Sequence, residues 1–208
     1  MPFAGTYVLG GKFYSLQNYR GVPEIEDAVT YFLENMSIPI KPILLNTYEY
    51  FDLINETSSK EYIPQNQLEK KNYIENVLSQ KLMDYEMEDM PKIDELIFML
   101  ESSYQRFEVK RKEIGFSSET VVLIYLENDK YFLIPMNGKL TQIIKKNNLV
   151  NLDNYVIYSL DLRLLKWILK GPRFAHWNNA EVGSHITFER KPNIFERGLY
   201  HAMCFFHM

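Results

Sequence analysis

The sequence predicts an α+β protein, in which an antiparallel β meander with packed helices follows a helical middle segment and an N-terminal strand. Three observations lead to this fold class. Apolar residues recur at helical spacing in several segments between residues 24 and 107, short apolar runs separated by turn formers follow residue 120, and helical spacing returns near the end of the chain. The 208 residues, 46% of them hydrophobic, suffice for a buried core.

The first elements are a strand and a helix. The apolar segment Phe3–Leu9 lies between glycines and predicts a strand at the start of the chain. Pro23 and the acidic residues after it suit a helix N-terminus, and the apolar face that follows predicts a helix over residues 24–37. Residues 46–62 mix aromatic residues with turn formers, which predicts an irregular connector.

The middle of the chain predicts two helices, one over residues 66–87 and one from residue 93 to shortly before Gly115. Strands are then expected over residues 121–126, 131–134 and 140–144, with turns at Asn128-Asp129 and at Asn137-Gly138. A fourth strand is expected over 155–158, a short helix over 161–170 and a final helix over 194–206. These elements group into a terminal strand and loop (1–22), a mostly helical segment (23–115) and an α+β C-terminal domain (116–208).

Composition excludes several classes of protein. The net charge of −4 is unfavourable for nucleic-acid binding, although residues 161–208 carry seven Lys or Arg against four Asp or Glu. The sequence contains neither an apolar run long enough for a membrane helix nor a basic segment leading an apolar signal core. The single cysteine, Cys204, cannot form an internal disulfide, which favours a reducing compartment. We therefore expect a cytoplasmic protein with no nucleic-acid or membrane partner.

No motif for catalysis or metal binding is present, so the sequence assigns no catalytic, cofactor-binding or metal-ligating residue. The four histidines, at 176, 185, 201 and 207, lack the short spacings of zinc sites. A metal site assembled in three dimensions from His176, His185 and His201 is an alternative interpretation. Cys204 lies on the apolar face of the final helix and is interpreted as a small hydrophobic residue.

The most distinctive residues of the tail are candidates for a contact or packing site, and packing is the interpretation that periodicity favours. They are His176, Trp177, Asn178, His185 and Arg190. Trp177 is expected to anchor the tail, with its polar neighbours bonding nearby backbone groups.

Two separated stretches carry a resemblance to a known family. Met1–Val8 (MPFAGTYV) is similar to a strand near the end of the metallo-hydrolase domain, and residues 161–195 (from DLRLLK through Trp177 and Gly183 to RKPNIF) are similar to the closing segment. The family is the metallo-β-lactamase superfamily, in its CMP-N-acetylneuraminate hydroxylase-like branch. Residues 40–150 carry no such resemblance.

The resemblance implies a C-terminal portion without a metal centre. Members bind zinc or iron through a His-x-His-x-Asp-His motif in the N-terminal half of the fold, and this chain has no His-x-His. It would begin at the last strand of a metallo-β-lactamase-type sheet, as a fragment or a separately encoded partner, without cofactor and without catalysis of its own. A structural, substrate-shaping or subunit-contact role follows, with a metallo-β-lactamase-fold catalytic domain or a second copy of the chain as the partner. One cysteine also cannot supply the ligands of the hydroxylase's iron–sulfur module.

A second hypothesis is a stand-alone binding or structural module. A meander with helices on one face is similar to small sterol-carrier-like α+β domains, which hold apolar ligands between sheet and helices. A pocket lined by Phe132, Trp167, Phe195 and Leu199 would favour this hypothesis.

Overall fold

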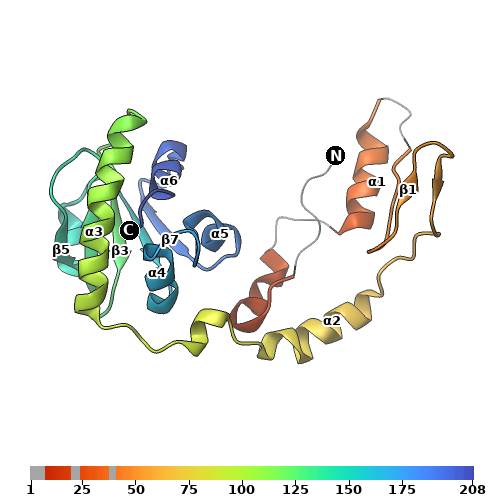
Figure 1. Cartoon of the computed structure of the whole chain (residues 1–208), viewed down its shortest axis with the longest axis horizontal. Coiled ribbons are helices and arrows are strands. Elements are labelled where there is room, and N and C mark those ends of the chain that lie inside the picture. Colours follow the sequence, from red (N-terminus) through yellow and green to blue (C-terminus); the bar gives the residue numbers. More distant parts are fainter. Residues whose placement is uncertain (1–7, 20–23, 38–40) are drawn as a thin grey trace. The chain divides into compact units, whose positions relative to one another are not determined.

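The structure, a computed structural model, describes residues 8–19, 24–37 and 41–208 and divides the chain into two compact units, residues 1–82 and 83–208 (Figure 1). The boundaries expected from the sequence lie after residues 22 and 115. The long helix α3 (Ile93–Glu113), assigned there to the helical segment, belongs to the same unit as the sheet, because its apolar face packs into the core that the sheet also lines.

The first unit is helical with one small hairpin. It contains a 3-10 helix (Gly11–Tyr19), α1 (Ile25–Asn35), the strands β1 (Phe51–Asp52) and β2 (Thr57–Ser58), α2 (Gln67–Asn76) and a 3-10 turn (Leu78–Gln80). The prediction of α1 is confirmed, whereas the connector over residues 46–62 contains the unexpected hairpin. Most of the predicted strand over residues 3–9 lies outside the described residues, and its described part, Val8 and Leu9, belongs to no strand.

The prediction of one helix over residues 66–87 is wrong in its length. Asn66 caps α2 by accepting hydrogen bonds from the backbone N–H groups of Leu68 and Glu69, but the helix ends at Asn76. None of its residues is buried, so no packing supports further helical turns, and 3-10 turns at 78–80 and 84–87 take their place.

The second unit is a five-stranded sheet with helices on one face, which confirms the α+β class. Its strands are β3 (Val121–Tyr125), β4 (Lys130–Ile134), β5 (Gln142–Lys145), β6 (Tyr155–Ser159) and β7 (Thr187–Lys191), and the order in the sheet is β5-β4-β3-β6-β7. The first three strands form the antiparallel meander that was expected. The sheet as a whole is mixed, because β6 pairs in parallel with β3 and β7 then pairs antiparallel with β6.

Helices α3, α4 (Leu162–Leu169) and α6 (Arg197–Met203) pack with the sheet around the main core of the unit (Figure 1). Side chains alternate along β3: Val122 and Ile124 face this core, while Leu123 joins a smaller cluster with Tyr131, Leu133 and Ile157 on the other face. The helix predicted over 161–170 is confirmed, with the Asp161 side chain as its N-cap.

Two features of the tail differ from expectation. A short helix, α5 (Trp177–Val182), lies in a segment where no element was predicted. The final helix starts at Arg197 instead of 194, because the Ile194 N–H bonds to the Pro192 carbonyl (2.8 Å) and holds the chain in a turn. In the described part of the chain, no helix combines the length and apolarity needed to cross a membrane.

Candidate functional site

Trp177 lies at the first position of α5 and is buried, with 4% of its surface exposed. Its indole Nε1–H donates a hydrogen bond to the Phe206 carbonyl (2.8 Å), and its ring contacts those of Tyr158 and Phe206 edge-on. The residue therefore ties α5 to the end of the chain and to β6, the anchoring role that the sequence suggested.

The polar neighbours of Trp177 serve local structure. His176 caps α5, since its Nδ1 accepts a hydrogen bond from the Asn178 N–H (3.2 Å), and the Asn178 side chain is exposed. His185 lies with its Nδ1 3.0 Å from the Tyr85 hydroxyl and its ring edge-on to the tyrosine ring. His201 instead contacts Phe205, so the three histidines considered for a metal site have separate surroundings.

Arg190, near the end of β7, is the tail candidate that reaches a cavity. Its Nε donates a hydrogen bond to the Tyr200 hydroxyl (2.6 Å). Its guanidinium carbon lies 5.1 Å from the ring centroid of Phe188 and 5.4 Å from that of Tyr200, within the range of cation–π attraction. The side chain is thus held in one orientation from two sides.

The cavity beside Arg190 has a volume of about 340 Å³ and lies where several segments of the second unit converge. The residues before β3, the start of β6, the end of β7 and the segment leading into α6 each contribute to it. Its lining is Ser118, Glu119, Thr120, Asn154, Tyr155, Val156, Arg190, Lys191, Pro192, Ile194, Phe195, Glu196, Leu199 and Tyr200. We call this cavity the β7–α6 cavity.

Aromatic rings connect the cavity wall with the core. Tyr200 stacks on Phe195 on one side (centroids 4.6 Å apart) and on Tyr158 on the other (6.1 Å). Tyr158 in turn contacts Phe188 and Trp177 edge-on. We call these five residues the aromatic cluster; it brings Trp177 and Arg190 into one structural group, which His176, Asn178 and His185 do not join.

The polar groups behind the cluster are poorly solvated. Burial raises the pKa of Tyr158 well above its ordinary value, and no described residue is a hydrogen-bond partner of its hydroxyl. Burial likewise raises the pKa of Glu181, against an opposing effect of the Arg190 charge, and raises the pKa of Cys204. Each of these groups favours its neutral form more than it would in water.

Sequence reasoning missed Tyr158 and Tyr200 as site residues. Both stand at core positions of elements that were predicted. An apolar pattern, however, does not distinguish a tyrosine that only packs in the core from one whose hydroxyl accepts a hydrogen bond from an arginine. Within residues 8–19, 24–37 and 41–208, no three His, Cys, Asp or Glu side chains are grouped so that they could hold a metal ion.

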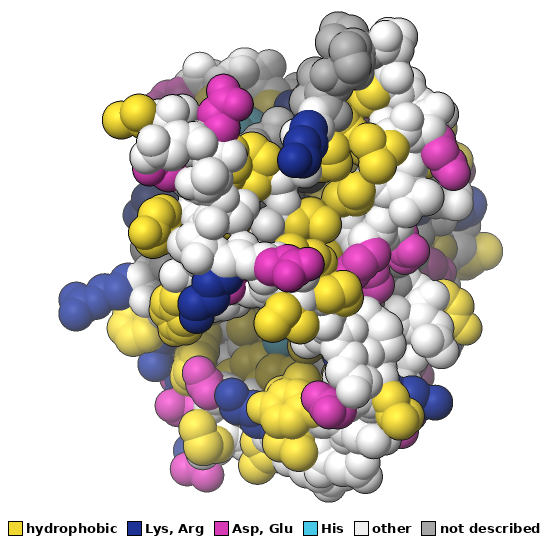
Figure 2. Space-filling view, turned by 90° about the vertical axis from the view of Figure 1, so that its right-hand side faces the viewer, with side chains coloured by type: hydrophobic (Ala, Val, Ile, Leu, Met, Phe, Trp, Pro, Cys, Tyr) yellow, Lys and Arg dark blue, Asp and Glu magenta, His cyan; other side chains and the backbone are white. Residues whose placement is uncertain are grey.

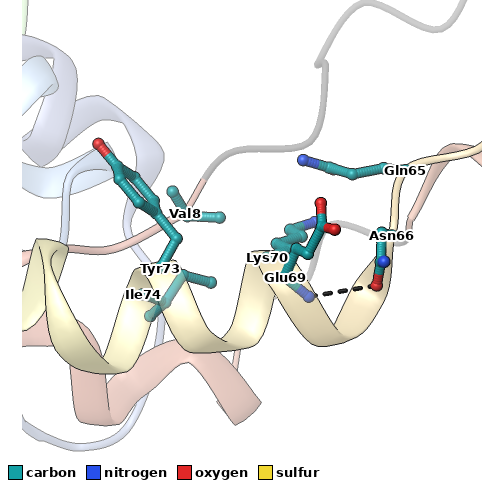
Figure 3. A pocket seen from close by; sticks show the side chains of 7 residues that line it. All are labelled: Val8, Gln65, Asn66, Glu69, Lys70, Tyr73 and Ile74. Atoms are coloured by element: carbon teal, nitrogen blue, oxygen red, sulfur yellow. Dashed lines mark hydrogen bonds between the residues drawn. The ribbon is translucent and has the colours of Figure 1, made fainter.

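A larger cavity, about 650 Å³, lies in the first unit against α2 (Figure 3). Val8, Tyr73 and Ile74 form its apolar part, and the remaining lining residues, Gln65, Asn66, Glu69 and Lys70, are polar. Two of these polar groups are committed to structure: Asn66 caps α2, and Lys70 forms an ion pair with Glu24. This cavity offers a ligand fewer uncommitted groups than the β7–α6 cavity does.

Comparisons of the chain with protein-family models, with curated proteins and with solved structures find no match.

Proposed function

We propose that the protein is the C-terminal portion of a metallo-hydrolase-like protein of the metallo-β-lactamase fold, in the CMP-N-acetylneuraminate hydroxylase-like branch. It acts through subunit contact, by binding a catalytic domain that carries the metal-binding motif, and has no metal chemistry of its own. The resemblance of Met1–Val8 and of residues 161–195 supports the family. The lone Cys204 supports a cytoplasmic setting.

The exposure of apolar side chains in the first unit is the observation that carries the contact role. Among the described residues of 8–82, only Leu9 and Gly11 are buried. The second unit, in contrast, has an extensive core. Leu9 is the one buried apolar side chain among the described residues of the first unit, so this unit gains little hydrophobic stabilisation of its own. Its exposed apolar side chains are best explained as surface for another protein.

Helix α1 shows this most clearly. The helix is amphipathic, but none of its residues is buried, and Leu33 is 57% exposed. Tyr31 is 69% exposed and Ile25 40%. Hydrophobic side chains also stand among charged ones on the molecular surface shown in Figure 2. An amphipathic helix in a groove of a partner is a common way to bury such a face.

Co-expression tests the proposal. The genomic sequence upstream of the Met1 codon is expected to encode a metallo-β-lactamase-fold segment with the His-x-His-x-Asp-His motif, and a tagged form of that segment is expected to co-purify with this chain. Amide exchange in α1 should slow in the complex, because the helix becomes covered.

Matched variants locate the contact. Leu33→Asp is expected to abolish co-purification, whereas Val109→Asp, at a similarly exposed position in the second unit (61%), should leave it unchanged. Absence of the motif upstream, or equal effects of the two variants, would count against the proposal.

A stand-alone sterol-carrier-like module is the second candidate, and the sheet with helices on one face favours it. The residues expected to line its pocket are dispersed, however. Phe195 and Leu199 line the β7–α6 cavity, but Phe132 is buried in the core and Trp167 packs edge-on against Tyr85. Saturable binding of a sterol or fatty acid, lost on Leu199→Ala, would favour this candidate over the first.

A further inference from the structure

We propose that the β7–α6 cavity binds a small organic carboxylate with a flat apolar body, with Arg190 holding the carboxylate and Phe195 stacking on the flat part. The inference goes beyond the contact function, because it concerns the second unit alone and needs no other chain. The volume of about 340 Å³ lies at the lower end of the range for small-molecule sites.

The free end of the Arg190 guanidinium carries the proposal. Its Nε donates a hydrogen bond to the Tyr200 hydroxyl, but Nη1 and Nη2 have no hydrogen-bond partner among the described residues. Glu181 is near enough to interact with the Arg190 charge, yet the two form no ion pair. A guanidinium that is half-buried and held on two aromatic rings presents its remaining N–H groups in a fixed plane, the geometry that a carboxylate meets with two parallel hydrogen bonds.

Phe195 provides the apolar contact. One face of its ring stacks on Tyr200, with an interplanar angle of 23°, yet 61% of the residue remains exposed at the lining of the cavity. Because its position is supported from behind, the outer surface of the ring can stack with a flat ligand without ordering a mobile side chain.

The other charges of the lining favour a monoanion. Lys191 adds positive charge, but its Nζ already donates a hydrogen bond to the Leu152 carbonyl (3.0 Å). Glu119 and Glu196 add negative charge, which opposes a doubly charged phosphate ester more strongly than a carboxylate. The combination of one uncommitted guanidinium, two carboxylates and an exposed ring therefore fits an aryl or other flat monocarboxylate best.

Nuclear magnetic resonance on the ¹⁵N-labelled full chain tests this directly, with phenylacetate as the probe. We expect saturable shifts of backbone amides at residues 118–120, 154–156 and 190–200, with a dissociation constant in the low millimolar range. Benzylamine, which has the ring but the opposite charge, and inorganic phosphate, which lacks the ring, should not saturate at the same concentrations.

Three variants separate the contributions. Arg190→Gln should weaken phenylacetate binding at least about tenfold, since it removes a charge-assisted pair of hydrogen bonds. Arg173→Gln, at an exposed arginine outside the cavity, is the control and should leave binding unchanged. Phe195→Ala should weaken binding about two- to tenfold, and because the residue is largely exposed this variant tests the site even where Arg190→Gln fails to fold.

Absence of saturable shifts with phenylacetate up to about 20 mM would overturn the proposal, since an aryl carboxylate that uses both contacts should bind more tightly than this. Equal saturation by phosphate or benzylamine would also overturn it. So would phenylacetate binding that Phe195→Ala leaves unchanged. None of these measurements needs a metallo-hydrolase partner, so their failure and the failure of the contact function are separate results.

Discussion

Removal of the Trp177 indole is expected to destabilise the second unit by about 3–5 kcal/mol, the usual cost of truncating a buried aromatic residue to alanine. The side chain is 4% exposed, and it joins α5 to the tail through the hydrogen bond to the Phe206 carbonyl. Trp177→Ala therefore loses the contacts with Tyr158 and Phe206 and leaves a carbonyl without its partner.

Trp177→Phe separates the contribution of ring packing from that of the hydrogen bond, because it keeps a ring and removes the N–H donor. We expect it to lower the free energy of unfolding by about 1–2 kcal/mol. Urea unfolding followed by far-UV circular dichroism measures both, since this signal does not depend on the tryptophan itself. Phe174→Ala, at an aromatic residue that is 55% exposed, is the control and should cost less than about 1 kcal/mol. A loss below about 1 kcal/mol for Trp177→Ala would refute the anchoring role.

Four further predictions concern the exchange of α1, the metal content, His207 and two tyrosines. In amide-exchange experiments on the chain alone, α1 should exchange faster than α3, because α1 has no buried residue and α3 has six; equal protection would contradict this. Metal analysis of the purified chain should find no stoichiometric zinc or iron, and metal that disappears in His176→Ala/His185→Ala would overturn the non-catalytic assignment. Burial lowers the pKa of His207, against the opposing effect of its hydrogen bond to the Met208 carbonyl, and the charges of Arg106 and His176 lower it further. As the pH falls, the unfolded chain therefore binds this proton before the folded chain does. The free energy of unfolding should fall as the pH drops below about 6.5, and His207→Gln should weaken that dependence. Tyr158→Phe should leave stability unchanged or raise it by up to about 1 kcal/mol, because the lost hydroxyl has no described partner, whereas Tyr200→Phe, which removes the acceptor of Arg190, should lower it by about 1–2 kcal/mol.

Local patterns were sufficient to predict much of the second unit. The spacing of Leu96, Leu100 and Phe107 predicts α3, and these are its fully buried apolar residues. The turn between β3 and β4 was also predictable, because Asn128 and Asp129 both adopt positive φ angles (51° and 56°), which these residue types tolerate better than most. In both cases the determinants lie within a few residues of one another.

Local patterns of this kind could not predict the order of the strands in the sheet. Val122 pairs with Val156 in the parallel ladder between β3 and β6, although more than 30 residues separate them. An apolar run predicts a strand but does not select its neighbour, and a meander extended to its fourth strand would have placed 155–158 beside β5. The chain instead returns past β4 and β5, so that β3 lies in the centre of the sheet.

The candidate site was predictable only in part, for the same reason. Arg190 stands out in the sequence, but its partner Tyr200 lies on a helix ten residues later, and the orienting contact depends on how α6 folds back along β7. Cys204 was also predictable only in part. Its apolar neighbours predict a small hydrophobic residue on the face of the final helix, but α6 ends at Met203 and Cys204 is the half-buried residue that follows it. Partial burial raises the pKa of its thiol.

The aromatic cluster connects the stability of the second unit to the properties of the cavity. It runs from Trp177, almost wholly buried, through Tyr158 and Tyr200 to Phe195, which is 61% exposed. Because each ring is supported by the next, the exposed end is held by the core and not by flexible loop contacts, and the orientation of Arg190 depends on the same Tyr200. A site supported in this way pays little entropy to order its side chains when a ligand binds. Substitution of Trp177 should therefore disturb the cavity through a distant ring, whereas substitution of Phe195 should change binding with little effect on folding.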